Sequence, residues 1–187
     1  MTKSILVLFV CCFVLKGTAQ KPTDTIATKA GGYDIPIRIK LPKKATGKSP
    51  VYFFVHGGGW NGGDAMHVPP ARLHNDANYL ADQLEVIYVG LAYRCKGNNA
   101  TFSDAIEDLE ASVQWFFDNA ENYNADITRI GFGGASAGST LAAIMAQKYK
   151  NCKLLVGAEG MYNLVEHSEE RSLFPNQKAR SQHQKSN

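Results

Sequence analysis

Short apolar runs separated by polar segments make up most of the chain. Thr25 to Ala30 and Tyr33 to Leu41 alternate between apolar and polar positions, which is typical of strands. Gly31-Gly32 lies between them and predicts a hairpin turn. The second strand carries three isoleucines on one face, namely Ile35, Ile37 and Ile39. The folded region is therefore expected to open with an antiparallel pair.

Four later segments are predicted to be strands, and the first of them is apolar without alternation, as a strand buried on both faces is. They are Val51 to Val55, Val86 to Arg94, Arg129 to Phe132 and Lys153 to Val156. Helical spacing of apolar residues separates them. One helix is expected to start at Pro70, a second at a cap formed by Thr101 or Ser103, and a third just after Gly138.

The predicted helices each have one apolar face. In the first this face holds Leu73, Ala77, Leu80, Ala81 and Leu84; in the second it holds Phe102, Ile106, Leu109, Val113, Phe116 and Phe117. The alternation of strands and helices predicts the α/β class, with a mostly parallel sheet and helices on both faces. Asn119 to Asp126 is expected to be a loop.

Length and composition favour a single folded domain. The chain has 187 residues, of which 44% are hydrophobic, and this is enough apolar material for a sizeable core. The first 19 residues differ, because Lys3, an apolar run and Gly17-Thr18-Ala19 have the order of a secretory signal peptide. The apolar run is too short to span a bilayer, so export and cleavage before Gln20 are expected, with no membrane attachment afterwards.

Charge and cysteine content limit the partners and cofactors that the protein is expected to bind. Loss of Lys3 and Lys16 with the signal peptide takes the formal net charge from +3 to +1, which argues against a nucleic-acid partner. Cys95 and Cys152 remain, and they either form one disulfide or stay as free thiols. Neither cysteines nor histidines cluster at ligand spacing, so no metal and no organic cofactor are expected.

Gly134-x-Ser136-x-Gly138 lies between a predicted strand and a predicted helix. The pattern fits a nucleophile elbow, in which a sharp turn exposes a serine hydroxyl and glycines leave room for the strained backbone. The N–H of Ala137, at the start of the following helix, is suited to stabilising an oxyanion. These features predict Ser136 as a nucleophile for attack on an acyl carbon.

A second glycine-rich segment follows another buried strand. His56-Gly57-Gly58-Gly59-Trp60 exposes backbone N–H groups with few side chains in the way, which suits an oxyanion pocket or a phosphate cradle. Ligands of parallel α/β sheets bind at the carboxyl ends of the strands. The two glycine motifs both fall at that edge, and they predict one common site.

Five segments together resemble the α/β-hydrolases, in the branch of hormone-sensitive-lipase-like esterases and feruloyl or acetyl esterases with an H-G-G-G oxyanion loop. They are His56 to Trp60, Tyr93-Arg94, Glu107-Asp108 with Trp115, Asp126-x-x-Arg129-Ile130-Gly131, and Gly134 to Gly138. The resemblance implies that Ser136 is the nucleophile and that the N–H groups of Gly58, Gly59 and Ala137 form the oxyanion hole. It also implies that His56 shapes the glycine loop and that Arg94 pairs with Asp108.

The resemblance further implies an acid and then a histidine downstream of the serine. Only 51 residues follow Ser136, and those from Glu166 to Asn187 are largely polar. We expect this stretch to be a disordered tail. The histidines after the serine are His167 and His183, with Glu159, Glu166, Glu169 and Glu170 as candidate acids. The expected organisation is a signal peptide at 1–19, the N-terminal portion of an α/β-hydrolase at 20–165 and a tail at 166–187.

Three functions are consistent with these features. The first is a secreted or periplasmic serine esterase, truncated at its C-terminus, that acts on a small-molecule or polysaccharide-linked ester. The second is a non-catalytic protein whose glycine pocket binds a carboxylate or a sugar. The third is a serine peptidase, although residues 20–50 are too few for the accessory domain that such enzymes usually add. The sequence does not indicate an oligomeric state.

Overall fold

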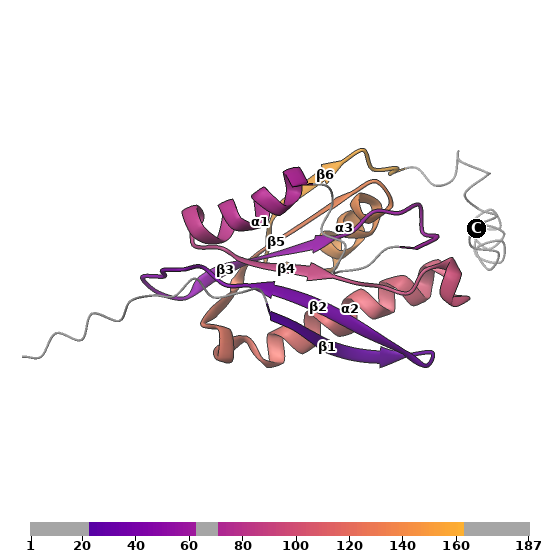
Figure 1. Cartoon of the computed structure of the whole chain (residues 1–187), viewed down its shortest axis with the longest axis horizontal. Coiled ribbons are helices and arrows are strands. Elements are labelled where there is room, and N and C mark those ends of the chain that lie inside the picture. The colour runs from indigo at the N-terminus through magenta and orange to yellow at the C-terminus, as the bar shows by residue number, and fades with distance from the viewer. Residues whose placement is uncertain (1–22, 63–70, 163–187) are drawn as a thin grey trace, which may run out of the picture.

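The computed structural model describes residues 23–62 and 71–162, and a mixed sheet lies at the centre of this part of the chain (Figure 1). Its strands are β1 (Thr23–Ala30), β2 (Tyr33–Lys40), β3 (Ser49–Val55), β4 (Ile87–Leu91), β5 (Ala125–Ala135) and β6 (Cys152–Ala158). Their order in the sheet is β1-β2-β4-β3-β5-β6. β1 and β2 are antiparallel to each other, β2 is antiparallel to β4, and β3 to β6 run parallel.

Helices cover both faces of the sheet, as the sequence predicts. They are α1 (Ala71–Leu84), α2 (Phe102–Asp118) and α3 (Ala137–Lys148), and short 3₁₀ turns lie at Lys96–Asn98 and Ala120–Tyr123. Figure 1 shows α1 and α2 on opposite sides of the strands. The packing agrees, because Phe54 and Tyr88 face α1, whereas Phe53 faces α2.

Aromatic rings fill the core on the side of α2 and α3. Phe53 in β3 stacks on Phe132 in β5 with ring centroids 5.2 Å apart, and the edge of Phe116 in α2 meets Phe53 at 5.5 Å. Leu109 and Val113 are fully buried beside them. Each such buried side chain stabilises the fold by about 1.5–3 kcal/mol. These contacts hold α2 against the centre of the sheet.

The local turn and cap predictions are confirmed. Gly31 and Gly32 have φ angles of 55° and 80°, the two positive values that a tight hairpin turn requires. Thr101 caps α2, and not Ser103: its hydroxyl accepts from the N–H of Asp104 at 3.2 Å. The Asp104 carboxylate in turn accepts from the N–H of Thr101 at 2.7 Å, which completes a capping box.

Several predicted boundaries are wrong. β4 ends at Leu91, because the next residues leave the strand ladder, and Tyr93 and Arg94 bond to other elements instead. The expected loop over Asn119 to Asp126 contains a 3₁₀ turn, and β5 already begins at Ala125, which pairs with Ser49.

The prediction that Leu84 is buried with the apolar face of α1 is also wrong. Leu84 is 52% exposed, whereas Ala77 and Ala81 on the same helix are buried. α1 ends at Leu84, and Glu85, with φ of 55°, turns the chain into β4. The final turn of the helix is therefore buried at Ala81 but exposed at its last residue.

Strand β6 lies at the edge of the sheet and pairs with β5 within the described residues. Leu154, Leu155 and Val156 are 52%, 45% and 47% exposed, so apolar side chains on both faces of the strand are partly exposed. Cys152 at its start and the buried Cys95 are free thiols, which leaves the predicted alternative of a disulfide unsupported. No helix in the described part of the chain is long and apolar enough to cross a membrane.

Candidate active site

Ser136 occupies the sharp turn between β5 and α3. β5 ends at Ala135 and α3 begins at Ala137, so no other residue lies between strand and helix. Ser136 has φ of 52° and ψ of −123°, a conformation that costs a non-glycine residue about 1–3 kcal/mol. Ser136 is exposed to solvent, whereas the next two residues, Ala137 and Gly138, are buried. The predicted elbow is present, with the serine at its tip.

Close backbone packing explains the glycines on either side of the serine. A Cβ atom on Gly134 would lie 2.3 Å from the carbonyl oxygen of Gly138. A Cβ atom on Gly138 would lie 2.2 Å from the oxygen of Val55 and 2.3 Å from that of His56. The first turn of α3 therefore rests directly on the end of β3.

The glycine loop meets the elbow at this point. β3 and β5 are parallel neighbours, and Val55 is opposite Gly134, so the loop after β3 starts beside the elbow. A Cβ atom on Gly57 would lie 3.3 Å from Cβ of Ser136. The two predicted motifs thus lie together at the carboxyl edge of the strands.

Three successive residues of the glycine loop have positive φ angles, which most residues avoid. Gly58, Gly59 and Trp60 have φ angles of 125°, 59° and 57°. Gly58 is exposed, and Trp60 is 2% exposed and anchors the far end of the loop in the core, where it contacts Phe102. Within the described residues, the backbone hydrogen bonds outside helices and strands include none donated by Gly58 or Gly59.

The N–H of Ala137 is a first-turn helix donor, a group that has no partner inside its own helix. Such donors carry the positive end of the helix dipole. The assignment of Gly58, Gly59 and Ala137 to an oxyanion hole is compatible with these positions and stays a prediction.

His56 holds the glycine loop from one side. Its Nδ1 lies 2.7 Å from the carbonyl oxygen of Gly57, and because a carbonyl accepts, Nδ1 carries the proton. The ring stacks on Tyr93 with centroids 4.4 Å apart and an interplanar angle of 10°. The hydroxyl of Tyr93 donates to the carbonyl of His56 at 3.0 Å. His56 is 4% exposed and is engaged with the loop, in keeping with its expected role in shaping it.

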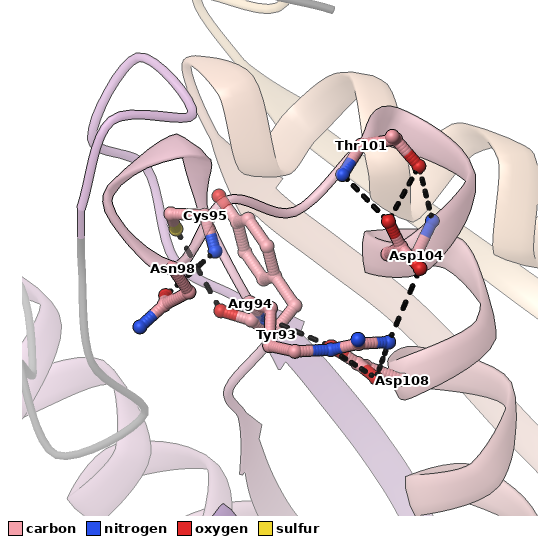
Figure 2. A network of polar contacts seen from close by, with 7 residues as sticks. All are labelled: Tyr93, Arg94, Cys95, Asn98, Thr101, Asp104 and Asp108. Atoms are coloured by element: carbon pink, nitrogen blue, oxygen red, sulfur yellow. Dashed lines mark hydrogen bonds and ion pairs between the residues drawn. The ribbon is translucent and has the colours of Figure 1, made fainter. Parts of the chain in front are cut away.

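Arg94 and Asp108 form the ion pair that the resemblance implies (Figure 2). Nε and Nη2 of Arg94 each donate at 2.8 Å to the carboxylate, and the N–H of Arg94 donates to it at 2.9 Å. Hydrogen bonds that Arg94 donates to Asp108 raise the pKa of Arg94 above its usual value. The pair fixes the end of β4 to α2, next to Tyr93.

Cys95 lies in the same network (Figure 2) but is unsuited to chemistry. Burial raises the pKa of its thiol to about 11, so it is protonated at neutral pH.

The motif that begins at Asp126 lies at the opposite edge of the sheet from Ser136. The Asp126 carboxylate accepts from Arg129 at 2.6 Å, and Arg129 donates to the carbonyl of Lys48, so this motif joins the starts of β3 and β5.

The candidate acids and bases downstream of the serine lie mostly outside the described residues. This is true of His167, His183, Glu166, Glu169 and Glu170. Glu159 is described; it is exposed, directly follows β6 and has φ of 56°. Of the five histidines in the sequence, His56 alone has a described side chain.

Two contacts at the site were not predicted from the sequence. The N–H of Ser136 donates to the carbonyl of Ala158 at 2.7 Å, so the end of β6 fixes the backbone of the elbow. The segment after β6 also folds back on α3, where Thr140 donates to the carbonyl of Met161 at 2.6 Å. The crowded Gly157 and Gly160, which face the ring of Tyr162, are the sequence feature that accompanies this turn.

Comparison with known proteins agrees with this geometry. Residues 37–179 match the BD-FAE family. Carboxylesterase NlhH of Mycobacterium tuberculosis is 34% identical over 131 residues, which cover 67% of this chain and 39% of that protein. Arylacetamide deacetylase of Bos taurus is 36% identical over 119 residues, covering 62% and 29% respectively. The chain spans less than half the length of these curated relatives.

Solved structures resemble the described fold. A bacterial heroin esterase superposes with a TM-score of 0.58 at 28% identity and covers 73% of this chain and 41% of its own. Esterase 2 of Thermogutta terrifontis, phosphoramylated by tabun, has a TM-score of 0.69 at 18% identity, covering 83% and 62%, which shows the fold alone. Since the family match extends over more than half of the sequence, the chain belongs to the BD-FAE family and has the fold of the α/β-hydrolase esterases.

Proposed function

We propose that this chain supplies the nucleophile and the oxyanion donors of a secreted carboxylic-ester hydrolase that works through an acyl-enzyme on Ser136. The observation that carries the proposal is the exposed serine in a strained turn, with Gly57 packed against it. Relatives named as a carboxylesterase and a deacetylase support the same type of reaction.

In the proposed reaction, Oγ of Ser136 forms a bond to the acyl carbon as its proton passes to a base. The carbonyl oxygen becomes negatively charged, and the N–H groups of Gly58, Gly59 and Ala137 donate to it. The alcohol then leaves with a proton, and water releases the acid from the serine. The base and its orienting acid belong to the family pattern downstream of the serine.

The proposed substrate is an ester of a small molecule or of a polysaccharide, because we propose that the protein is exported. The signal-peptide pattern in the first 19 residues supports export. N-terminal sequencing of protein from the culture medium or periplasm is expected to begin at Gln20. Protein that retains Met1 inside the cell would contradict export while leaving the reaction open.

Hydrolysis of p-nitrophenyl acetate tests the reaction. Replacing Ser136 with Ala is expected to remove all hydrolysis above that of buffer. Ser103→Ala is the matched control, because Ser103 is also exposed and lies near the start of a helix, as Ser136 does. Activity that survives in Ser136→Ala would contradict the assignment.

Removal of the base lowers the rate of a triad enzyme by several orders of magnitude, so the hydrolysis rate of this chain reports whether a base is positioned at Ser136. His167→Ala and His183→Ala are expected to leave the residual rate unchanged. If either substitution abolished the hydrolysis, that histidine would be the base, which would contradict our expectation.

A further inference from the structure

Tyr93 contacts His56, the residue that begins the glycine loop. It is the second residue after β4, and its side chain is 3% exposed. Its hydroxyl donates to the carbonyl of His56, and its ring stacks on the His56 ring. Burial, with a smaller effect of the Cys95 thiol, raises the pKa of Tyr93, so the hydroxyl stays protonated and remains a donor. One side chain thus holds both the backbone and the ring of His56.

The carbonyl that Tyr93 holds is at the junction between loop and elbow. A Cβ atom on Gly138 would lie 2.3 Å from this oxygen, so the carbonyl is confined between the Tyr93 hydroxyl and the first turn of α3. A displacement of His56 in either direction would change the separation of the glycine loop from Ser136.

The His56 ring carries this constraint forward to the proposed oxyanion donors. Its Nδ1–H binds the carbonyl of Gly57, and that carbonyl shares one planar peptide unit with the N–H of Gly58. The described residues contain no cis peptide bond, so the N–H of Gly58 points opposite to the Gly57 carbonyl. Fixing the carbonyl therefore fixes the direction of the Gly58 N–H.

The backbone of Tyr93 is itself immobilised by the next residue. Both the N–H and the guanidinium of Arg94 donate to Asp108, which is 1% exposed in α2. Figure 2 shows this pair next to Tyr93. The tyrosine is therefore held by α2 on one side and holds the loop on the other.

We propose that Tyr93 is a positioning residue for the oxyanion loop, acting through the carbonyl and the ring of His56. This inference rests on the proposed function for its catalytic consequence, although its structural part does not. Removal of the Tyr93 hydroxyl releases the His56 carbonyl and lets the Gly57–Gly58 peptide reorient. Misplacement of about 1 Å in such a site costs up to about a hundredfold in rate.

Tyr93→Phe tests the proposal, because phenylalanine keeps the ring that stacks on His56 and removes the donor. Tyr88→Phe is the control, since Tyr88 is another buried tyrosine of the same strand segment, 5% exposed, and faces α1. In ¹H–¹⁵N spectra, Tyr93→Phe is expected to shift or broaden the amide signals of Gly58 and Gly59. Unchanged signals in Tyr93→Phe, or equal changes in Tyr88→Phe, would overturn the proposal.

The catalytic part is measured by the reaction of Ser136 with a p-nitrophenyl phosphonate. Serine Oγ bonds to phosphorus, its proton passes to solvent or a base, and nitrophenolate leaves with the electron pair. Tyr93→Phe is expected to lower the maximal labelling rate about tenfold and to leave the half-saturating concentration within about twofold. A maximal rate equal to that of the unchanged protein would overturn the positioning role.

The two measurements separate the two hypotheses. Absence of labelling at Ser136 in the unchanged protein would refute the proposed function, and the spectra would then decide the role of Tyr93 alone. Labelling that is lost equally in Tyr88→Phe would indicate a general effect of buried hydroxyls, which contradicts a specific role for Tyr93.

Discussion

At the scale of single residues, the elbow depends on glycines, because there is no room for a Cβ atom at these positions. Gly138 and Gly134 are crowded by backbone atoms, which cannot move aside as the end of a flexible side chain can. Ser136 itself has a backbone conformation that side chains disfavour, and the hydrogen bond from its N–H to Ala158 helps to hold it there.

Gly138→Ala is expected to lower the free energy of unfolding by about 3 kcal/mol, because the new methyl group overlaps the carbonyls of Val55 and His56. Gly47→Ala is the control. A Cβ atom there meets nothing within 4 Å, and the change is expected to stay within about 1 kcal/mol. Urea denaturation measures both values, and equal losses would show that the packing of α3 on β3 is looser than described.

At the scale of elements, the sheet is tied to α2 by the Arg94–Asp108 pair and by the capping box at the start of the helix. Both place acidic groups in the first two turns of α2, where the helix dipole favours them. Asp108 is almost fully buried, whereas the pair between Lys29 and Asp34 on the hairpin is exposed. Loss of the buried pair is therefore expected to lower the free energy of unfolding more than loss of the exposed pair.

Asp108→Asn is expected to destabilise the protein by about 3 kcal/mol, because it removes the counter-charge of a largely buried guanidinium. Asp34→Asn breaks the exposed pair and is expected to cost less than about 1 kcal/mol. Thermal or urea unfolding of the two variants gives the comparison. Similar losses would contradict the view that Arg94–Asp108 anchors the site.

The capping box makes the stability of the protein depend on pH in the acidic range. Hydrogen bonds from the Thr101 side chain, then from its backbone and with Arg94 nearby, lower the pKa of Asp104 below 3.8. The folded pKa is thus below the unfolded one, so this contribution is present above pH 3.8 and disappears as pH falls through the folded pKa. Between pH 6 and 3, Asp104→Asn is expected to lose less stability than the unchanged protein. Parallel curves would contradict this.

The sequence predicts elements best where the signal is local. Unbroken apolar runs gave the buried strands, and glycine spacing gave the elbow and its loop, because steric room at a glycine is a property of the position itself. The periodicity of α1 shows which face is apolar but not how much of that face its neighbours cover, and Leu84 is exposed. The contact of Tyr93 with His56 depends on how strands lie side by side, which no local pattern encodes.

At the scale of the whole molecule, β6 is the edge strand of the sheet in the part of the chain that the structure describes. Its exposed apolar residues and unpaired strand edge are features that favour pairing with another chain. Residues 20–187 expressed alone are therefore expected to self-associate, in contrast to a soluble monomer with small apolar patches.

Leu154→Lys is expected to reduce this association, because a charge on an edge strand opposes pairing. Leu84→Lys is a closely matched control: both leucines are 52% exposed, and Leu84 lies on α1 away from the edge. Light scattering over a range of concentrations compares them. A monodisperse monomer with a sharp unfolding transition before any substitution would contradict the prediction and favour the non-catalytic alternative.

The central claim is that Ser136 is the reactive nucleophile. Its most direct test is treatment with an organophosphonate ester, followed by peptide mass spectrometry to locate the modified residue. We predict a single phosphonylated site at Ser136, no labelling in Ser136→Ala, and undiminished labelling in Ser103→Ala. Modification at Ser139 or elsewhere that persists in Ser136→Ala would contradict the account.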